Sequence, residues 1–177
     1  MKITSATQVA TYEPSRDDLG IYWAEEFHEP EGEESYYSYD YCLAKTTDTY
    51  PVLVSKIIRS QYTQDAELAA INSGGADYYR FLQFRETAKN LARGWLGLEQ
   101  QPVPRWQFSS IIMDRLTDTE REALMSADVW QVKWLLQKTV ANQAISDADP
   151  DFALGVMMLS QLGIIAEGRW DELLAGD

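Results

Sequence analysis

Residues 35–46 read SYYSYDYCLAKT, and their side chains alternate between two faces in the manner of a β-strand. One face carries Tyr37, Tyr39, Tyr41 and Leu43, and the other carries Ser38, Asp40, Cys42 and Ala44. We expect the tyrosine face to cover a helix. From about residue 49 the apolar side chains recur with the helical period instead. The change of period predicts an α+β fold with strands first and helices after.

Two further runs rich in Thr, Val, Tyr and Trp lie before this strand, at residues 3–12 and 21–28. A turn at 14–20 that ends in glycine separates them, and the charged loop 29–34 separates the second run from the third. The N-terminal segment therefore predicts a three-stranded antiparallel meander.

Helical patterns fill the remaining two-thirds of the chain. Thr49 or Asp48 can cap a helix that tolerates Pro51 in its first turn, and two further helices are predicted at 65–72 and 77–95. Glycines and prolines near residue 100 indicate a boundary. We therefore predict one domain at 1–100, with strands and helices, and an all-helical domain at 101–177.

Within 101–177 we expect helices at 104–116, 126–145, 149–162 and 167–174. Thr117 and Glu120 have the spacing of a capping box, which predicts a short helix up to Met125. The segment 126–145 is apolar on nearly every face, so it is either central or pressed against a partner.

Charge is strongly unbalanced along the 177 residues. The 15 Lys and Arg against 28 Asp and Glu give a net charge of −13, which argues against a protein that binds nucleic acid directly. The first 50 residues carry −8, residues 51–100 carry +1 and the rest carry −6. No apolar run has the length of a signal peptide core or a membrane span, so we expect no export and no membrane contact.

The sequence contains no recognisable catalytic motif, and we predict that the protein is not an enzyme. His28 and Cys42 are the single residues of their types, which excludes a disulfide within the chain and a metal site with several histidines. Asp147, Asp149 and Asp151 alternate as in a calcium loop, but the glycine and the distal glutamate of such a loop are missing. We expect Asp149 to cap a helix instead, and we expect no metal or cofactor.

Six side chains are candidates for a partner interface. Trp23 and Trp170 are open as interface anchors. Trp130 is a further candidate, although the core is the default position for a tryptophan on a segment that is apolar on nearly every face. Arg85, Lys89 and Arg93 form a basic stripe at i, i+4 and i+8. We expect this stripe to pair with acids of the N-terminal segment, in this chain or in a neighbouring copy.

Several motifs resemble those of small acidic proteins of bacteriophage and prophage tails. The helical module at the C-terminal end of those proteins has counterparts here in Gln107-Phe108 with Ile111-Ile112, Trp134, residues 159–163 and residues 171–174. Residues 54–62 are similar to a Val-x-x-Ile-Ile-Arg-x-Gln-Tyr helix that follows a strand meander in small acidic phage-encoded proteins.

This resemblance implies a virion or tail-assembly protein without catalysis. Its partners would be other phage structural proteins or copies of itself, in a homo-oligomer or a larger assembly, and it would pass from the host cytoplasm into the virion. Two alternatives stay open. One is an acidic inhibitor that presents Glu25, Glu26, Glu29, Glu31, Glu33, Glu34 and Asp40 to a basic host nucleic-acid enzyme. The other is an enzyme that uses carboxylates alone.

Overall fold

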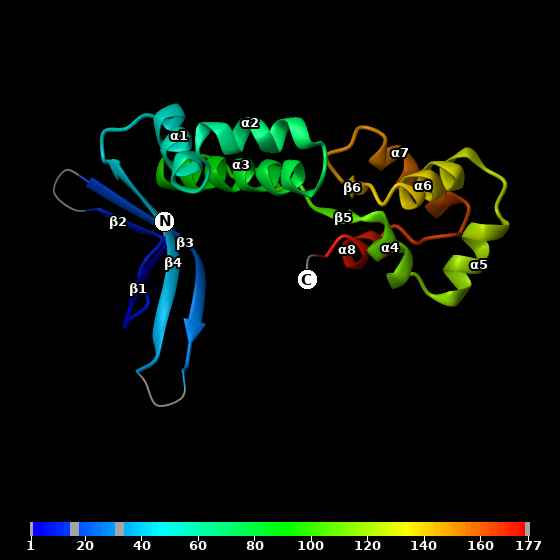
Figure 1. The fold of residues 1–177 in the computed structure, drawn as a ribbon, viewed down its shortest axis with the longest axis horizontal. Helices are drawn as coiled ribbons and strands as arrows, with labels where there is room; N and C mark the ends of the chain where they lie inside the picture. Colours follow the sequence, from blue (N-terminus) through cyan, green and yellow to red (C-terminus); the bar gives the residue numbers. More distant parts are fainter. Residues whose placement is uncertain (1, 15–17, 31–33, 176–177) are drawn as a thin grey trace. The chain divides into compact units, whose positions relative to one another are not determined.

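The structure, a computed structural model, describes residues 2–14, 18–30 and 34–175. It confirms the α+β class: an N-terminal antiparallel sheet is followed by a mostly helical remainder (Figure 1). The chain forms two compact units, the first from residues 1–69 and 84–102 and the second from 70–83 and 103–177. No described helix is both long and apolar enough to cross a membrane.

The sheet has four strands: β1 (Lys2–Ser5), β2 (Tyr12–Pro14), β3 (Asp18–His28) and β4 (Tyr36–Lys45). Their order is β1-β4-β3-β2, so only β2, β3 and β4 form a meander. The predicted single strand at 3–12 is wrong because this run supplies both edges of the sheet. Between β1 and β2 the chain crosses one sheet face, where the Val9 N–H donates to the Tyr39 hydroxyl at 2.9 Å.

Two helices cover one face of this sheet. They are α1 (Tyr50–Gln61) and α3 (Ala76–Trp95), whose Leu53, Ile57, Ala88 and Ala92 pack with Leu19, Ile21, Cys42 and Ala44 of the sheet. The covered face is therefore the one that carries Cys42 and Ala44, and the predicted helix over the tyrosine face is wrong. The small side chains of Cys42 and Ala44 leave room for helices to approach the strand closely.

Helix positions in the first hundred residues follow the predictions. Thr49 is the N-cap residue of α1, with Pro51 in the first turn, as expected. The second helix, α2 (Gln64–Ser73), ends before Gly74, whose φ of +61° suits a residue without a Cβ. The helix α3 is longer than either and contributes residues to both compact units.

In the second unit the prediction of helices alone is wrong. Residues 106–108 form β5 (Trp106–Phe108), which pairs antiparallel with β6 (Ala144–Ser146). The predicted helix at 104–116 is thus reduced to α4 (Ser109–Arg115), and that at 126–145 to α6 (Trp130–Val140). Asn142 has a φ of +44°, a left-handed conformation that does not continue a helix, and β6 follows it.

Three more helices complete this unit: α5 (Asp118–Ser126), α7 (Phe152–Gln161) and α8 (Arg169–Leu173). The capping box of Thr117 and Glu120 is present, with both of its hydrogen bonds. Asp149 does not cap α7, because the N-cap residue is Asp151, whose N–H donates to the Asp149 carboxylate at 3.0 Å. The core includes Leu124, Leu135, Ile145, Leu159, Ile165 and Trp170.

Candidate protein-binding surfaces

The hairpin of β3 and β4 extends away from α1 and α3 of the same unit as an arm (residues 22–30 and 34–41; Figure 1). The strand register shifts between Trp23 and Glu26, and Ala24 there has a φ of +52°. Such a β-bulge increases the local twist and changes the direction of the strand beyond it. After the bulge, Phe27 pairs with Tyr37 and His28 with Tyr36.

One face of the arm is aromatic and is not covered by a helix. On this outer face the rings of Tyr22 and Tyr41 stack at 5.8 Å, and those of Phe27 and Tyr37 lie at 5.0 Å. Phe27 and Leu43 are each 57% exposed, whereas Tyr39 is buried. This face continues from the arm onto the rest of the sheet, and we define the outer face as Ile3, Tyr22, Phe27, Tyr37, Tyr41 and Leu43.

Sequence reasoning found the tyrosine row but assigned it to the interior. Alternation shows which side chains share a face of a strand, but it does not show which face the helices cover. Tyrosines and a leucine in a row are typical of a buried face, so the pattern carried no sign that this face is open.

The acidic side chains of the arm differ in whether they bind other residues of the chain. Glu25 accepts two hydrogen bonds from Gln8 at 3.0 and 3.1 Å. Glu26 lies 3.4 Å from the Lys2 ammonium and 3.7 Å from the His28 ring. Glu29 and Glu34, nearer the hairpin end, are exposed, whereas Glu31 and Glu33 lie outside the described residues. Part of the acidic surface expected for an inhibitor is therefore already paired within the chain.

The structure separates the three candidate tryptophans. Trp170 is 3% exposed and its ring lies 5.5 Å from Phe152 in the core of the second unit, so its predicted role as an exposed anchor is wrong. The five-residue helix α8 buries it. Trp23 is half-buried and contacts Phe84 of α3 at 6.2 Å between ring centroids. Trp130 is 51% exposed on α6.

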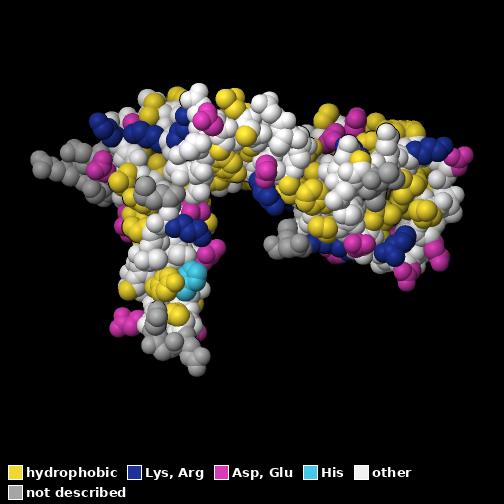
Figure 2. Space-filling model, in the orientation of Figure 1, with side chains coloured by type: hydrophobic (Ala, Val, Ile, Leu, Met, Phe, Trp, Pro, Cys, Tyr) yellow, Lys and Arg dark blue, Asp and Glu magenta, His cyan; other side chains and the backbone are white. Residues whose placement is uncertain are grey.

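The basic stripe on α3 is half-buried. Lys89 forms an ion pair with Glu86 of the same helix, and the guanidinium of Arg93 lies 5.8 Å from the centre of the Tyr50 ring. Lys89 and Arg93 thus bind neighbours on α3 and α1, so pairing of these two with N-terminal acids of the same chain is not what the structure shows. Arg85 is also half-buried. Figure 2 shows Lys and Arg side chains gathered over the α1 end of the first unit.

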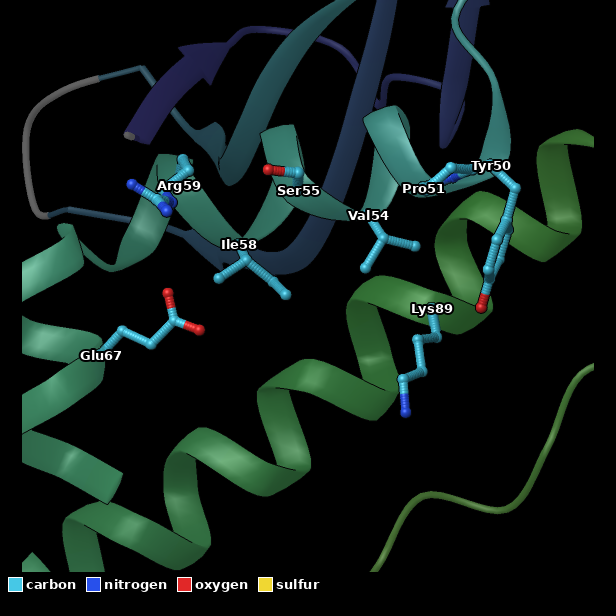
Figure 3. A pocket seen from close by; sticks show the side chains of 8 residues that line it. All are labelled: Tyr50, Pro51, Val54, Ser55, Ile58, Arg59, Glu67 and Lys89. Carbon is cyan, nitrogen blue, oxygen red and sulfur yellow. The ribbon is translucent and has the colours of Figure 1, made fainter. Parts of the chain in front are cut away.

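A pocket of about 310 Å³ lies beside the stripe, between α1, α2 and α3 (Figure 3). Val54 and Ile58 of α1 give it an apolar wall, with Tyr50 and Pro51 at one end. Arg59, Lys89 and Glu67 add charged groups at its rim. We call this cavity the α1–α3 pocket. It combines an apolar wall with two cations, of which Lys89 is paired with Glu86, and with the carboxylate of Glu67.

The junction that leads from β4 into α1 is fixed by Asp48. Its carboxylate accepts from the Lys56 ammonium at 2.6 Å and from the Lys45 N–H at 2.7 Å. The hydrogen bond from Lys56, the largest cause, lowers the pKa of the Asp48 carboxyl; burial opposes this, and the Lys45 N–H lowers the pKa further. The wall of the α1–α3 pocket is thereby anchored to the sheet.

We expect Asp48→Asn to lower the free energy of unfolding by roughly 1–2 kcal/mol at pH 7, because charge-assisted hydrogen bonds are lost. A carboxyl with a lowered folded pKa stabilises the fold above its unfolded pKa of about 3.9, and this contribution is lost as pH falls through the folded value. The difference between wild type and variant should therefore shrink below about pH 4. Urea unfolding at pH 7 and pH 2.5 measures it, with the exposed Glu99→Gln as control. A difference independent of pH would contradict this assignment.

The residues considered for chemistry are buried or bound to neighbouring side chains. Cys42 is buried, which raises the pKa of its thiol, and the His28 ring bonds to the Ser38 hydroxyl at 2.7 Å. Asp147 and Asp149 lie 3.0 Å from Arg105 and 3.3 Å from Lys138. In the described ranges, no three His, Cys, Asp or Glu side chains are placed to hold a metal ion together.

No protein-family model, curated protein or solved structure matches this chain. Function must therefore be argued from the surfaces themselves.

Proposed function

We propose that this chain is a non-catalytic subunit of a bacteriophage or prophage particle, or of its tail-assembly apparatus, and that it acts by binding other proteins. The observation that carries the proposal is the outer face, which no helix covers and on which Phe27 and Leu43 stay exposed on either side of the chain segment that crosses it at Tyr39. Burying one large apolar side chain contributes about 1.5–3 kcal/mol, so Phe27 and Leu43 together offer a substantial part of a binding energy.

The composition of the outer face supports a protein partner. Tyrosine and phenylalanine are enriched at protein interfaces, where they provide large contact areas with few rotatable bonds. The rings are also held by one another, since Tyr22 stacks on Tyr41 and Phe27 packs against Tyr37. The engagement of Glu25 and Glu26 by Gln8 and Lys2 favours this proposal over an acidic inhibitor.

Leu43→Asp tests the proposal in particles that carry the variant chain. Because Leu43 is exposed, we expect the thermal unfolding curve to stay unchanged, whereas the amount of chain in purified particles or assembly intermediates should fall at least tenfold. Quantitative mass spectrometry of those fractions measures it. Leu98→Asp, at an equally exposed leucine outside the arm, should be incorporated like wild type.

Absence of the wild-type chain from both particles and assembly intermediates would contradict the proposal. Equal incorporation of the Leu43→Asp and wild-type chains would show that the chain does not bind the particle or its assembly intermediates through the outer face.

A further inference from the structure

We propose that the end of the arm of one copy docks into the α1–α3 pocket of a second copy, so that the chain assembles head to tail. This inference rests on the proposed function and names the partner of the arm as the chain itself. The segment that enters the pocket is the one around Phe27, Glu29 and Glu34.

The arm cannot fill the pocket of its own chain. The helix α1 follows the C-terminal end of β4, whereas Phe27 pairs with Tyr37 at the N-terminal end. Phe27 also lies on the outer face of the sheet, whereas α1 and α3, which form the pocket, cover the opposite face. As long as the sheet is intact, only another molecule can bring an arm to the pocket.

The pocket has room for a phenyl ring. Its volume is about 310 Å³, and a cavity of about 150 Å³ lined by apolar side chains holds benzene. Val54, Ile58 and Pro51 provide the apolar contacts. Phe27 is the most exposed aromatic side chain of the outer face. The exposed part of its ring can therefore enter the pocket while the opposite edge of the ring keeps its contact with Tyr37.

The charges at the two ends are complementary. Residues 29–34 contain four glutamates, and of these Glu29 and Glu34 are exposed in the described part of the hairpin. At the pocket, Lys89 is already paired with Glu86 and Glu67 adds a negative charge. Arg59 is exposed and has no side-chain hydrogen bond or ion pair with any described residue, so it is the pocket cation that remains for the glutamates of the arm. Opposite charges of this kind orient a complex and fix its register more than they add affinity. Arg59 therefore orients the acidic end of the arm at the pocket.

Such an interface joins two different surfaces of the same chain. Each copy then keeps one unused arm and one unused pocket, so the contact extends into a ring or an open filament and does not stop at a symmetric dimer. Mixing two variants, each defective at a different surface, distinguishes this arrangement from a symmetric one.

Sedimentation velocity from about 1 to 500 µM chain, the range of weak interfaces, provides the test. We expect wild type to form species beyond the dimer as concentration rises. Phe27→Ala at the arm and Arg59→Glu at the pocket should each raise the apparent dissociation constant at least tenfold. Both side chains are exposed, and circular dichroism melting verifies that both variants fold. Lys133→Glu, an exposed cation of the second unit, is the matched control and should assemble like wild type.

An equimolar mixture of the two defective variants should form dimers and nothing larger. The intact pocket of the Phe27→Ala chain receives the intact arm of the Arg59→Glu chain, and the remaining arm and pocket are both defective. A wild type that stays monomeric over the whole range, an Arg59→Glu chain that assembles normally, or a mixture that stays monomeric would each overturn the inference. A monomeric chain that is nevertheless found in particles would leave the proposed function standing, and a self-associating chain absent from them would leave only this inference.

Discussion

Replacing Trp170 by alanine is expected to lower the free energy of unfolding by about 3–5 kcal/mol, the usual cost of truncating a fully buried tryptophan. Trp170 belongs to the core of the second unit, where its ring packs edge to face against Phe152. The loss removes this contact and leaves a cavity beneath α8. Urea unfolding followed by far-ultraviolet circular dichroism measures the change without depending on tryptophan fluorescence.

A second substitution at the same site separates packing from polarity. The Trp170 ring N–H is buried and has no acceptor among the described residues, an arrangement that costs stability. Trp170→Phe removes this donor and keeps a ring against Phe152, so it should cost less than about 1.5 kcal/mol.

The control is a tryptophan on the surface. Trp130→Ala, at a residue that is 51% exposed, should change the free energy of unfolding by less than about 0.5 kcal/mol. Equal losses for Trp170→Ala and Trp130→Ala would contradict the placement of the two residues.

A matched pair of leucines tests which face of the sheet the helices cover. Leu19 of β3 has 0% exposure and lies beside Ala44 under α1 and α3, so Leu19→Ala should cost about 2–5 kcal/mol. Leu43 of β4 lies on the outer face, and Leu43→Ala should cost less than about 0.5 kcal/mol.

The same chemical change is thus made on opposite faces of neighbouring strands, and urea unfolding compares the two. If Leu43→Ala were as costly as Leu19→Ala, a helix or another packed element would cover the tyrosine row, as the sequence pattern alone suggests.

Local signals in the sequence predicted most helix starts. Thr49 with Pro51 marked the beginning of α1, and the spacing of Thr117 and Glu120 marked that of α5. These signals succeed because capping depends on residues within one turn of one another.

Long-range packing was beyond the sequence patterns. The helix predicted at 104–116 is interrupted because Trp106 and Phe108 pair with Ser146 and Ala144, almost forty residues away. The single strand predicted at 3–12 divides because its two ends pair with different strands, β4 and β3. In both cases hydrogen bonding to a distant partner outweighs the local preference of the segment.

For the candidate interface residues, too, the sequence patterns do not show long-range packing. Trp130 lies on a segment that is apolar on nearly every face, where a core position was the default, yet it is exposed, whereas Trp170, a candidate anchor, is buried. The outer face of the arm was missed for a related reason, since a tyrosine row looks the same whether a helix covers it or not. The α1–α3 pocket draws on three helices, and no single segment of sequence carries its pattern.

The division of α3 between the two units has a consequence for the chain during its synthesis. All residues of the first unit have been translated once residue 102 is added, whereas the core of the second also needs Ile164, Ile165, Trp170 and Leu173. The first turns of α3, including the buried Phe81, belong to the unit that is finished last. Domains fold from the N-terminus as a chain leaves the ribosome, so the first unit acquires its arm and its pocket while the helix that it shares still has an exposed end. Ribosome-bound chains in which residue 102 has left the exit tunnel, but which end before residue 160, would therefore already carry both surfaces that we assign to assembly.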